Sequence, residues 1–353
     1  MRNTPRYTDD TIRVSMWTAL VGGAVVLLAA AVLGVMVGSV ALSPREVWSV
    51  VLGHLGARRS SDVVAEQIIW QIRLPRVLLA MIVGGALTTA GSVVQAMVRN
   101  SLADPFLLGV SSGASVGAAA VLLFGVFASL GLWALSVSSI AGALLAMLAV
   151  FAVARESGQL TPTRLVLCGV ALAAMFEALT SFLLFRGNPQ ATESVLFWLL
   201  GSFGRATWSQ LWFPAGSLAI AVTYLLFQAR ALNALAVGAD TATTLGVDVA
   251  RLRRNLFVVT SIVAGVAVAV SGVIGFVGLV VPHIVRIAVG SDHRRTLPVG
   301  LVWGATFMVL GDVLARIIVS PQEMPMGVIT AFVGAPVFIV LIRQRSYRYG
   351  TAG

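Results

Sequence analysis

The sequence predicts an all-α integral membrane protein with ten transmembrane helices and both termini in the cytoplasm. Composition, the lengths of the uncharged stretches and the positions of the arginines predict this fold class. Of the 353 residues, 58% are hydrophobic and 11% are charged, whereas soluble globular chains carry about 25% charged residues. Because a spanning helix needs about 20 apolar residues, this composition suffices for about ten crossings. We therefore expect residues 1–353 to form a single transmembrane domain.

Uncharged runs define the first five helices. The run from residue 14 to residue 44 is much longer than the apolar core of a signal peptide, about 7 to 15 residues, so we expect a retained first helix. Arg76 and Arg99 bracket the second run, and glycines between 125 and 131 divide the next long run into two helices. The expected spans are 14–44, 77–98, two helices within 105–154, and 165–185.

Aromatic, arginine and glycine positions define the other five helices. Trp208 and Trp212 are of the type enriched at membrane interfaces, and they open a sixth helix that ends near residue 229. After an arginine-rich stretch that ends at Arg254, Gly272 and Val273 divide the next apolar run into two helices. The ninth and tenth helices cover 297–319 and 327–342. Three loops are long enough for short helices: 43–74 and 186–209 outside, and 230–254 inside.

The basic residues orient the chain. With the termini inside, the cytoplasmic segments hold sixteen of the 24 basic residues and the outer segments hold eight. This is the bias expected of short cytoplasmic loops, so it explains the net charge of +10. We therefore predict no nucleic-acid partner.

Missing residue types exclude several kinds of chemistry. All 24 basic residues are arginine, so the chain has neither the lysine of a Walker A loop nor a lysine for Schiff-base catalysis. If the protein uses ATP, a partner must hydrolyse it. The single cysteine, Cys168, permits no internal disulfide, and with three histidines there is no Cys/His cluster of metal-site spacing, so we predict no metal site.

A series of motifs follows the whole chain in order. It begins with RLPR at residues 73–76 and the stretch GGALTTAGSVVQAMVRNSLADPFLLGVSSGA at 84–114. The motifs that follow are LCGVAL (167–172), FWLLGS (197–202), GADTATTLGV (238–247), SGVIGFVGLVVPHIVR (271–286), GDVLAR (311–316) and EMPMGVITAFVGAPVF (323–338). This order resembles the FecCD-type permeases of ABC importers.

The resemblance implies a type II ABC importer permease bundle in a prokaryotic cytoplasmic membrane. It implies a second permease copy, identical or a paralogue, an extracytoplasmic substrate-binding protein and a cytoplasmic ABC ATPase dimer. ATP and Mg²⁺ would bind to that ATPase, and the permease would bind no cofactor and catalyse no reaction. The cargo would be a metal chelate: ferric siderophore is the first expectation, followed by haem and cobalamin.

Three arginines lie at the outer mouths of helices, against the general bias. We expect Arg73, Arg76 and Arg316 to be exposed, and the resemblance implies that they dock the binding protein through its carboxylates. Interfacial snorkelling is the alternative for all three. For Arg316, an i, i+4 ion pair with Asp312 is a further alternative.

The inside loop 230–254 contains a short helix-compatible segment between two glycines. The resemblance implies that Gly238, Ala239, Asp240, Leu245 and Gly246 belong to the element that couples the permease to the ATPase. The alternative is a cytoplasmic loop that lies on the lipid headgroups.

Polar residues within or near the spans are candidates for the translocation path. Glu177 lies in the middle of the fifth helix, where a carboxylate is costly in lipid, so it faces either the path or a partner inside the protein. Gln95 is a second path candidate, although a structural role is our first interpretation. We interpret Asp104 as a helix N-cap and His283 as a hydrogen-bonded structural residue.

Two other functions were weighed against the permease. Residues 109–113 and 113–117 both match the nucleophile pattern G-x-S-x-G, which together with His283 would suggest an intramembrane serine hydrolase. Overlapping matches in a run of small residues indicate helix packing instead. An ion-coupled secondary transporter would need intramembrane charges, and Glu177 and Asp312 alone qualify.

Overall fold

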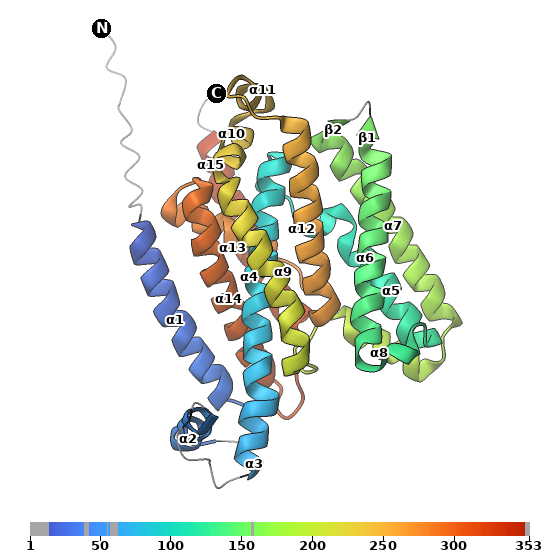
Figure 1. Cartoon of the computed structure of the whole chain (residues 1–353), viewed down its shortest axis with the longest axis vertical. Helices are drawn as coiled ribbons and strands as arrows, with labels where there is room; N and C mark the ends of the chain where they lie inside the picture. The colour runs from blue at the N-terminus through green and yellow to red at the C-terminus, as the bar shows by residue number, and fades with distance from the viewer. Residues whose placement is uncertain (1–13, 39–41, 55, 57–62, 157–158, 350–353) are drawn as a thin grey trace.

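A computed structural model describes residues 14–38, 42–54, 56, 63–156 and 159–349. Within these residues, ten long helices run along one common direction (Figure 1). Seven of them are long and apolar enough to cross a membrane, and the apolar stretches of the other three, α5, α13 and α15, are shorter. The ten are α1 (Met16–Met36), α4 (Leu74–Val98), α5 (Val110–Phe124), α6 (Ala134–Ala154), α7 (Pro162–Arg186), α9 (Trp208–Phe227), α12 (Val249–Ser271), α13 (Val277–Val289), α14 (His293–Ile317) and α15 (Met326–Tyr349).

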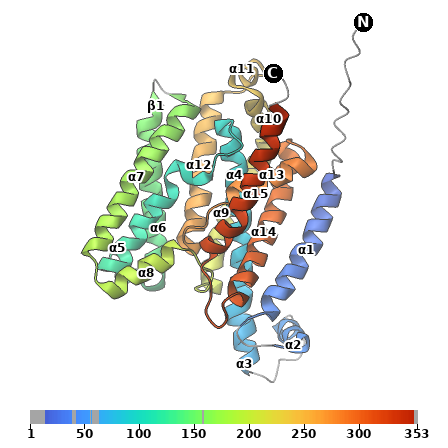
Figure 2. The ribbon, with the colours of Figure 1, turned by 180° about the vertical axis from the view of Figure 1, so that it is seen from behind.

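Short elements occupy the two ends of the bundle. The end at which α1 begins and α15 ends, the inner end, carries three of them (Figures 1 and 2). These are α10 (Ala229–Val237), α11 (Ala239–Thr244) and a hairpin of β1 (Arg155–Glu156) and β2 (Gln159–Leu160). The opposite, outer end carries α2 (Pro44–His54), α3 (Val63–Glu66) and α8 (Pro189–Leu199). The 3-10 turns Pro105–Leu108 and Ala128–Trp133 connect α4 to α5 and α5 to α6.

The second membrane helix begins earlier than the sequence predicts. A π-helical turn, Gln67–Arg73, joins α3 to α4, so one helix runs from Val63 to Val98. Pro75, which precedes the expected span 77–98, lies inside this helix. In the π turn each backbone N–H bonds to the carbonyl five residues back, as Leu74 N–H does to Ile69. This shift in hydrogen-bond register allows the helix to continue through Pro75, which has no N–H to donate.

The core forms around α4, whose span is 83% buried. Glycines allow close backbone contacts there: a Cβ added at Gly84 would overlap Gly304 of α14, and one at Gly91 would overlap Gly278 of α13. The same holds for Gly113 of α5 against Gly142 of α6. Small residues at helix contacts are what lipid-embedded bundles require, because lipid gives no hydrophobic drive for helices to associate.

The serine pattern lies inside a regular helix. Ser111 and Ser115 are both on α5, and the Ser115 hydroxyl donates to the Ser111 carbonyl at 2.9 Å. A nucleophile elbow needs a strand-to-helix turn, and this serine pair is on none. The hydrolase interpretation therefore has no geometric support.

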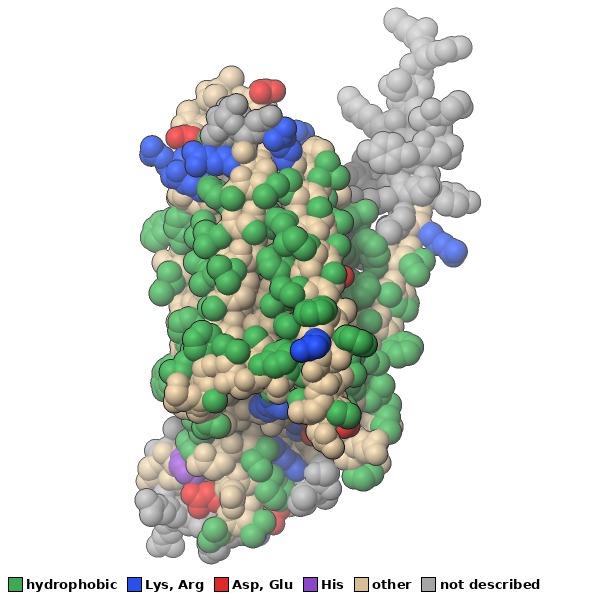
Figure 3. Space-filling model, turned by 90° about the vertical axis from the view of Figure 1, so that its right-hand side faces the viewer, with side chains coloured by type: hydrophobic (Ala, Val, Ile, Leu, Met, Phe, Trp, Pro, Cys, Tyr) green, Lys and Arg blue, Asp and Glu red, His purple; other side chains and the backbone are tan. Residues whose placement is uncertain are grey.

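The sides of the bundle are apolar. Figure 3 shows hydrophobic side chains over the long face on which α7 lies, with arginines gathered at the inner end. Only 17% of the α7 span and 28% of the α1 span are buried within the chain. These two helices therefore present their side chains to lipid or to another chain.

Candidate functional site

Four charged side chains meet at the outer end of α4 and α14, and we call them the outer ion cluster: Arg76, Asp312, Arg316 and Glu323. The Arg76 guanidinium donates to both Asp312 oxygens at 2.9 and 3.1 Å and to both Glu323 oxygens at 2.8 and 2.9 Å. Arg316 pairs with the same Asp312 at 3.1 Å. Asp312 is 1% exposed, and the two guanidinium groups that pair with it compensate the cost of burying its negative charge.

Two arginines also cap the outer end of α1. Arg73 donates to the carbonyls of Val35 and Met36 at 2.9 and 2.7 Å, and Arg316 donates to the carbonyl of Val37 at 2.6 Å. The last carbonyls of a helix lack partners within the helix, and cations are favourable at that end. The cluster and the caps thus join α1, α4 and α14 at their outer ends.

The expectation that the three arginines are exposed is wrong. Arg73, Arg76 and Arg316 are 5–6% exposed, because each points inward to carboxylates or carbonyls of its own chain. The alternative pairing of Arg316 with Asp312 is confirmed. Docking by these residues stays a prediction. Arg45 and Arg205 are exposed at this end, and neither was a docking candidate from the sequence.

The predicted helix between two glycines at the inner end is confirmed. Gly238 precedes α11, and Gly246 ends it with a φ of +80°. The Val247 N–H bonds to the Ala242 carbonyl and the Gly246 N–H to the Thr243 carbonyl, which is the Schellman arrangement. Ala242 is fully buried, whereas Asp240, Leu245 and Gly246 are exposed. The five residues Gly238, Ala239, Asp240, Leu245 and Gly246 therefore form one compact projection, which we call the inner projection.

A hydrogen-bonded group fastens α10 to the start of α14. The Asn233 side chain donates to Asp292 at 2.6 Å and accepts from the His293 backbone N–H at 2.9 Å. Burial alone would raise the pKa of Asp292, but bonds from the Arg294 N–H and Asn233, with the charges of Arg294 and Arg295, lower it overall. Asn233 was not among the residues expected from the sequence, although it is a polar residue within the apolar repeat of α10.

The two path candidates lie in different surroundings. Gln95 is 4% exposed and donates to the Gly278 carbonyl at 3.1 Å, so it lies in the contact between α4 and α13. This contact is the structural role expected first for Gln95, and a place on the translocation path stays a prediction. Glu177 is exposed in the middle of α7.

Asp104 has the predicted capping role. Its carboxylate accepts from the Phe106 N–H at 2.8 Å at the start of the 3-10 turn. Burial raises the pKa of Asp104 to about 6, although this hydrogen bond opposes the rise. His283 is buried on α13.

The bundle has the fold of a membrane permease of the ABC importer class. A solved metal-chelate type ABC transporter in an inward-facing conformation shares this fold, with a TM-score of 0.80, 33% identity, and coverage of 92% of this chain and 98% of that one.

The chain belongs to the FecCD transport family, whose model matches residues 25–344. It is 41% identical over 337 residues to the hemin transport system permease protein HmuU of Yersinia pestis, covering 94% of this chain and 97% of that protein. It is 42% identical over 278 residues to the vitamin B12 import system permease protein BtuC of Klebsiella pneumoniae, covering 78% and 83%. The chain is thus a transport subunit for metal chelates, and ATP hydrolysis lies on a separate subunit.

Proposed function

We propose that this permease imports a cobalamin-type chelate across a prokaryotic cytoplasmic membrane. Two permease copies would form the path, an extracytoplasmic binding protein would deliver the chelate, and an ABC ATPase dimer with ATP and Mg²⁺ would drive transport. The observation that carries the proposal is the 42% identity to a vitamin B12 permease, together with the 41% identity to a hemin permease. Both relatives are named for a metal held in a macrocycle, so this cargo class ranks above the ferric siderophore expected from sequence.

Glu177 favours cobalamin over haem. Its carboxylate is exposed in the middle of α7, where contact with lipid would be costly. A carboxylate beside the path would repel the propionates of haem and the acidic groups of many siderophores. It would accept hydrogen bonds from the amide side chains around a corrin ring.

Docking and coupling belong to opposite ends of the bundle in this proposal. The binding protein would dock at the outer end, where a partner carboxylate could replace Glu323 on Arg76, because Glu323 has a 46% exposed side chain. Arg73 and Arg316 would hold the outer end of α1 in place for this contact. The inner projection would enter the ATPase surface.

Reconstitution tests the proposed function directly. The permease would be placed in vesicles with its ATPase, and the binding protein would be added with cobalamin, haem or ferric siderophore. We expect ATP-dependent uptake of cobalamin that requires the binding protein. Uptake of haem or siderophore alone would overturn the cargo, and ATP-independent uptake would overturn the mechanism.

A further inference from the structure

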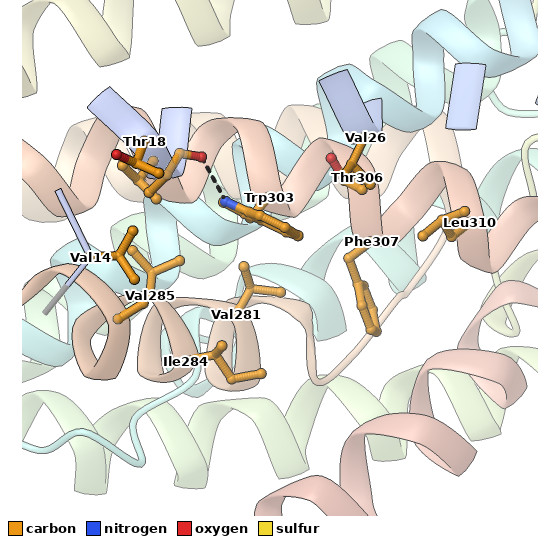
Figure 4. Close-up of a pocket in the computed structure, with 13 residues that line it drawn as sticks. Val14, Thr18, Val26, Val281, Ile284, Val285, Trp303, Thr306, Phe307 and Leu310 are labelled. Carbon is orange, nitrogen blue, oxygen red and sulfur yellow. Dashed lines mark hydrogen bonds between the residues drawn. The ribbon is translucent and has the colours of Figure 1, made fainter. Parts of the chain in front are cut away.

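An elongated apolar cavity of about 530 Å³ lies between α1, α13 and α14 (Figure 4). Thirteen residues line it, and all are apolar except Thr18 and Thr306. Trp303 lies midway along the cavity and donates its indole N–H to the Ala19 carbonyl of α1 at 3.2 Å. A Cβ added at Gly23 would come within 2.9 Å of the same indole nitrogen, so α1 touches α14 closely at this point. The cavity therefore persists beside a tight contact between the helices.

The cavity has the length of one bilayer leaflet. Its lining extends from Val14, which precedes α1, to Val26 on α1, and from Val299 to Leu310 along α14. At a rise of 1.5 Å per residue, the helical parts from Met16 to Val26 and from Val299 to Leu310 measure about 15 and 16 Å, roughly half of the hydrocarbon core of about 30 Å. At the inner end, the Val14 N–H bonds to the Ala288 carbonyl of α13.

The cavity is open toward the side of the bundle. Val26, Ile284 and Leu310 line it and are 39%, 46% and 38% exposed, so they border both the cavity and the surroundings of the protein. In a membrane these surroundings are acyl chains. A chain can therefore enter sideways without crossing a polar layer.

Two exposed arginines lie at the inner end of the cavity. Arg295 precedes Val299 by one turn, on the α14 stripe that continues through Trp303 and Leu310, and Arg294 is its neighbour. Neither side chain forms an ion pair with a carboxylate among the described residues. The acid closest in sequence, Asp292, already accepts hydrogen bonds from Asn233 and the Arg294 N–H.

We propose that this cavity holds one acyl chain of an anionic phospholipid from the inner leaflet, with its phosphate against Arg294 and Arg295. The apolar lining and the leaflet length suit an acyl chain, and the lateral opening lets that chain enter from the bilayer. The basic inner end suits the phosphate. This binding site does not depend on which chelate is transported. The bound chain fills the space that α1 leaves open beside α13 and α14.

Quenching of Trp303 tests the proposal in the full chain. The protein would be reconstituted in phosphatidylcholine vesicles with increasing fractions of phosphatidylglycerol brominated on its acyl chains. The signal of Trp303 is the difference between the wild type and Trp303→Phe. We expect half-quenching at a lower fraction of brominated phosphatidylglycerol than of brominated phosphatidylcholine. The double change R294Q/R295Q should raise that fraction at least about five-fold, which corresponds to about 1 kcal/mol for one basic residue near an anionic surface.

Matched variants separate this site from ordinary bilayer contact. R251Q/R254Q removes two exposed arginines from the same end on α12, which does not line the cavity, and should leave the quenching unchanged. Val285→Phe fills the cavity without changing charge and should weaken quenching by both lipids. Equal half-quenching by both lipids, or equal effects of the two arginine pairs, would overturn the proposal. If Trp303→Phe fails to fold, total tryptophan quenching compared between the two arginine pairs still decides.

Discussion

At the scale of single residues, Asp312 holds the outer ion cluster together, because within this cluster it is the carboxylate that pairs with both arginines. We expect Asp312→Asn to destabilise the protein by about 3–5 kcal/mol, since removing one partner leaves buried charge uncompensated. Glu323→Gln is the matched control: its side chain is 46% exposed, so its loss should cost less than about 1 kcal/mol. Unfolding of the purified protein in detergent measures both. Similar losses would show that Asp312 does not organise the cluster.

Asp104 predicts a pH dependence of stability. Its pKa is about 6 in the folded protein and about 3.9 in an unfolded chain. The folded state therefore binds the proton more tightly, so the free energy of unfolding should fall as pH rises from about 4 to about 6 and then level off. Asp104→Asn retains an oxygen that accepts from Phe106 and should flatten this slope. An unchanged slope in unfolding midpoints across this pH range would contradict the assignment.

At the scale of elements, the hydrophobic pattern predicts the helices well because lipid imposes a simple rule. All ten spans were predicted, and so was the helix between Gly238 and Gly246. The π turn before α4 was not predicted. A proline such as Pro75 usually marks a helix start, and a shift in hydrogen-bond register leaves no pattern in the sequence.

Burial of the three outer arginines was missed for a different reason. The partners of Arg76 lie at least 236 residues away along the sequence, and those of Arg73 at least 37 residues away. A sequence read along one helix reveals a neighbour such as Asp312 for Arg316, but not contacts that close across the bundle.

The two glycines around α11 differ in what they tolerate. Gly246 has a φ of +80°, so Gly246→Ala should cost about 1 kcal/mol locally and loosen the end of α11. Gly238 has an extended backbone, with φ 170°, and a Cβ there would meet only Thr241 Oγ1, at 3.6 Å. Gly238→Ala is therefore the matched control.

We expect Gly246→Ala to lower ATP-driven uptake and capture of the ATPase by the permease, and Gly238→Ala to leave both near wild type. The two assays distinguish loss of the ATPase contact from loss of transport alone. If the two variants behave alike, the shape of the inner projection does not determine coupling.

At the scale of the whole molecule, α1 and α7 are two membrane helices that the rest of the chain leaves largely uncovered, with 28% and 17% of their spans buried. Chemistry distinguishes their exposed faces. α1 carries no charged residue, as a lipid-facing helix requires, whereas α7 carries Glu177 in mid-span. A carboxylate at the centre of a helix in lipid would cost about 2.5–3.5 kcal/mol. The α7 face therefore suits a water-filled path between two permease copies.

Thiol labelling distinguishes the two faces in the reconstituted protein. In a Cys168→Ala background, which removes the one native cysteine, Glu177→Cys should react with a water-soluble maleimide, because the reactive thiolate needs water around it. Val21→Cys, at a residue of α1 that is 61% exposed, should stay unlabelled in lipid and become labelled once detergent has unfolded the protein. Labelling of Glu177→Cys should also fall when cobalamin, delivered by its binding protein in the presence of the ATPase, occupies the path. If both cysteines resist the reagent in the folded protein, α7 faces lipid or a dry contact, and Glu177 takes no part in choosing the cargo.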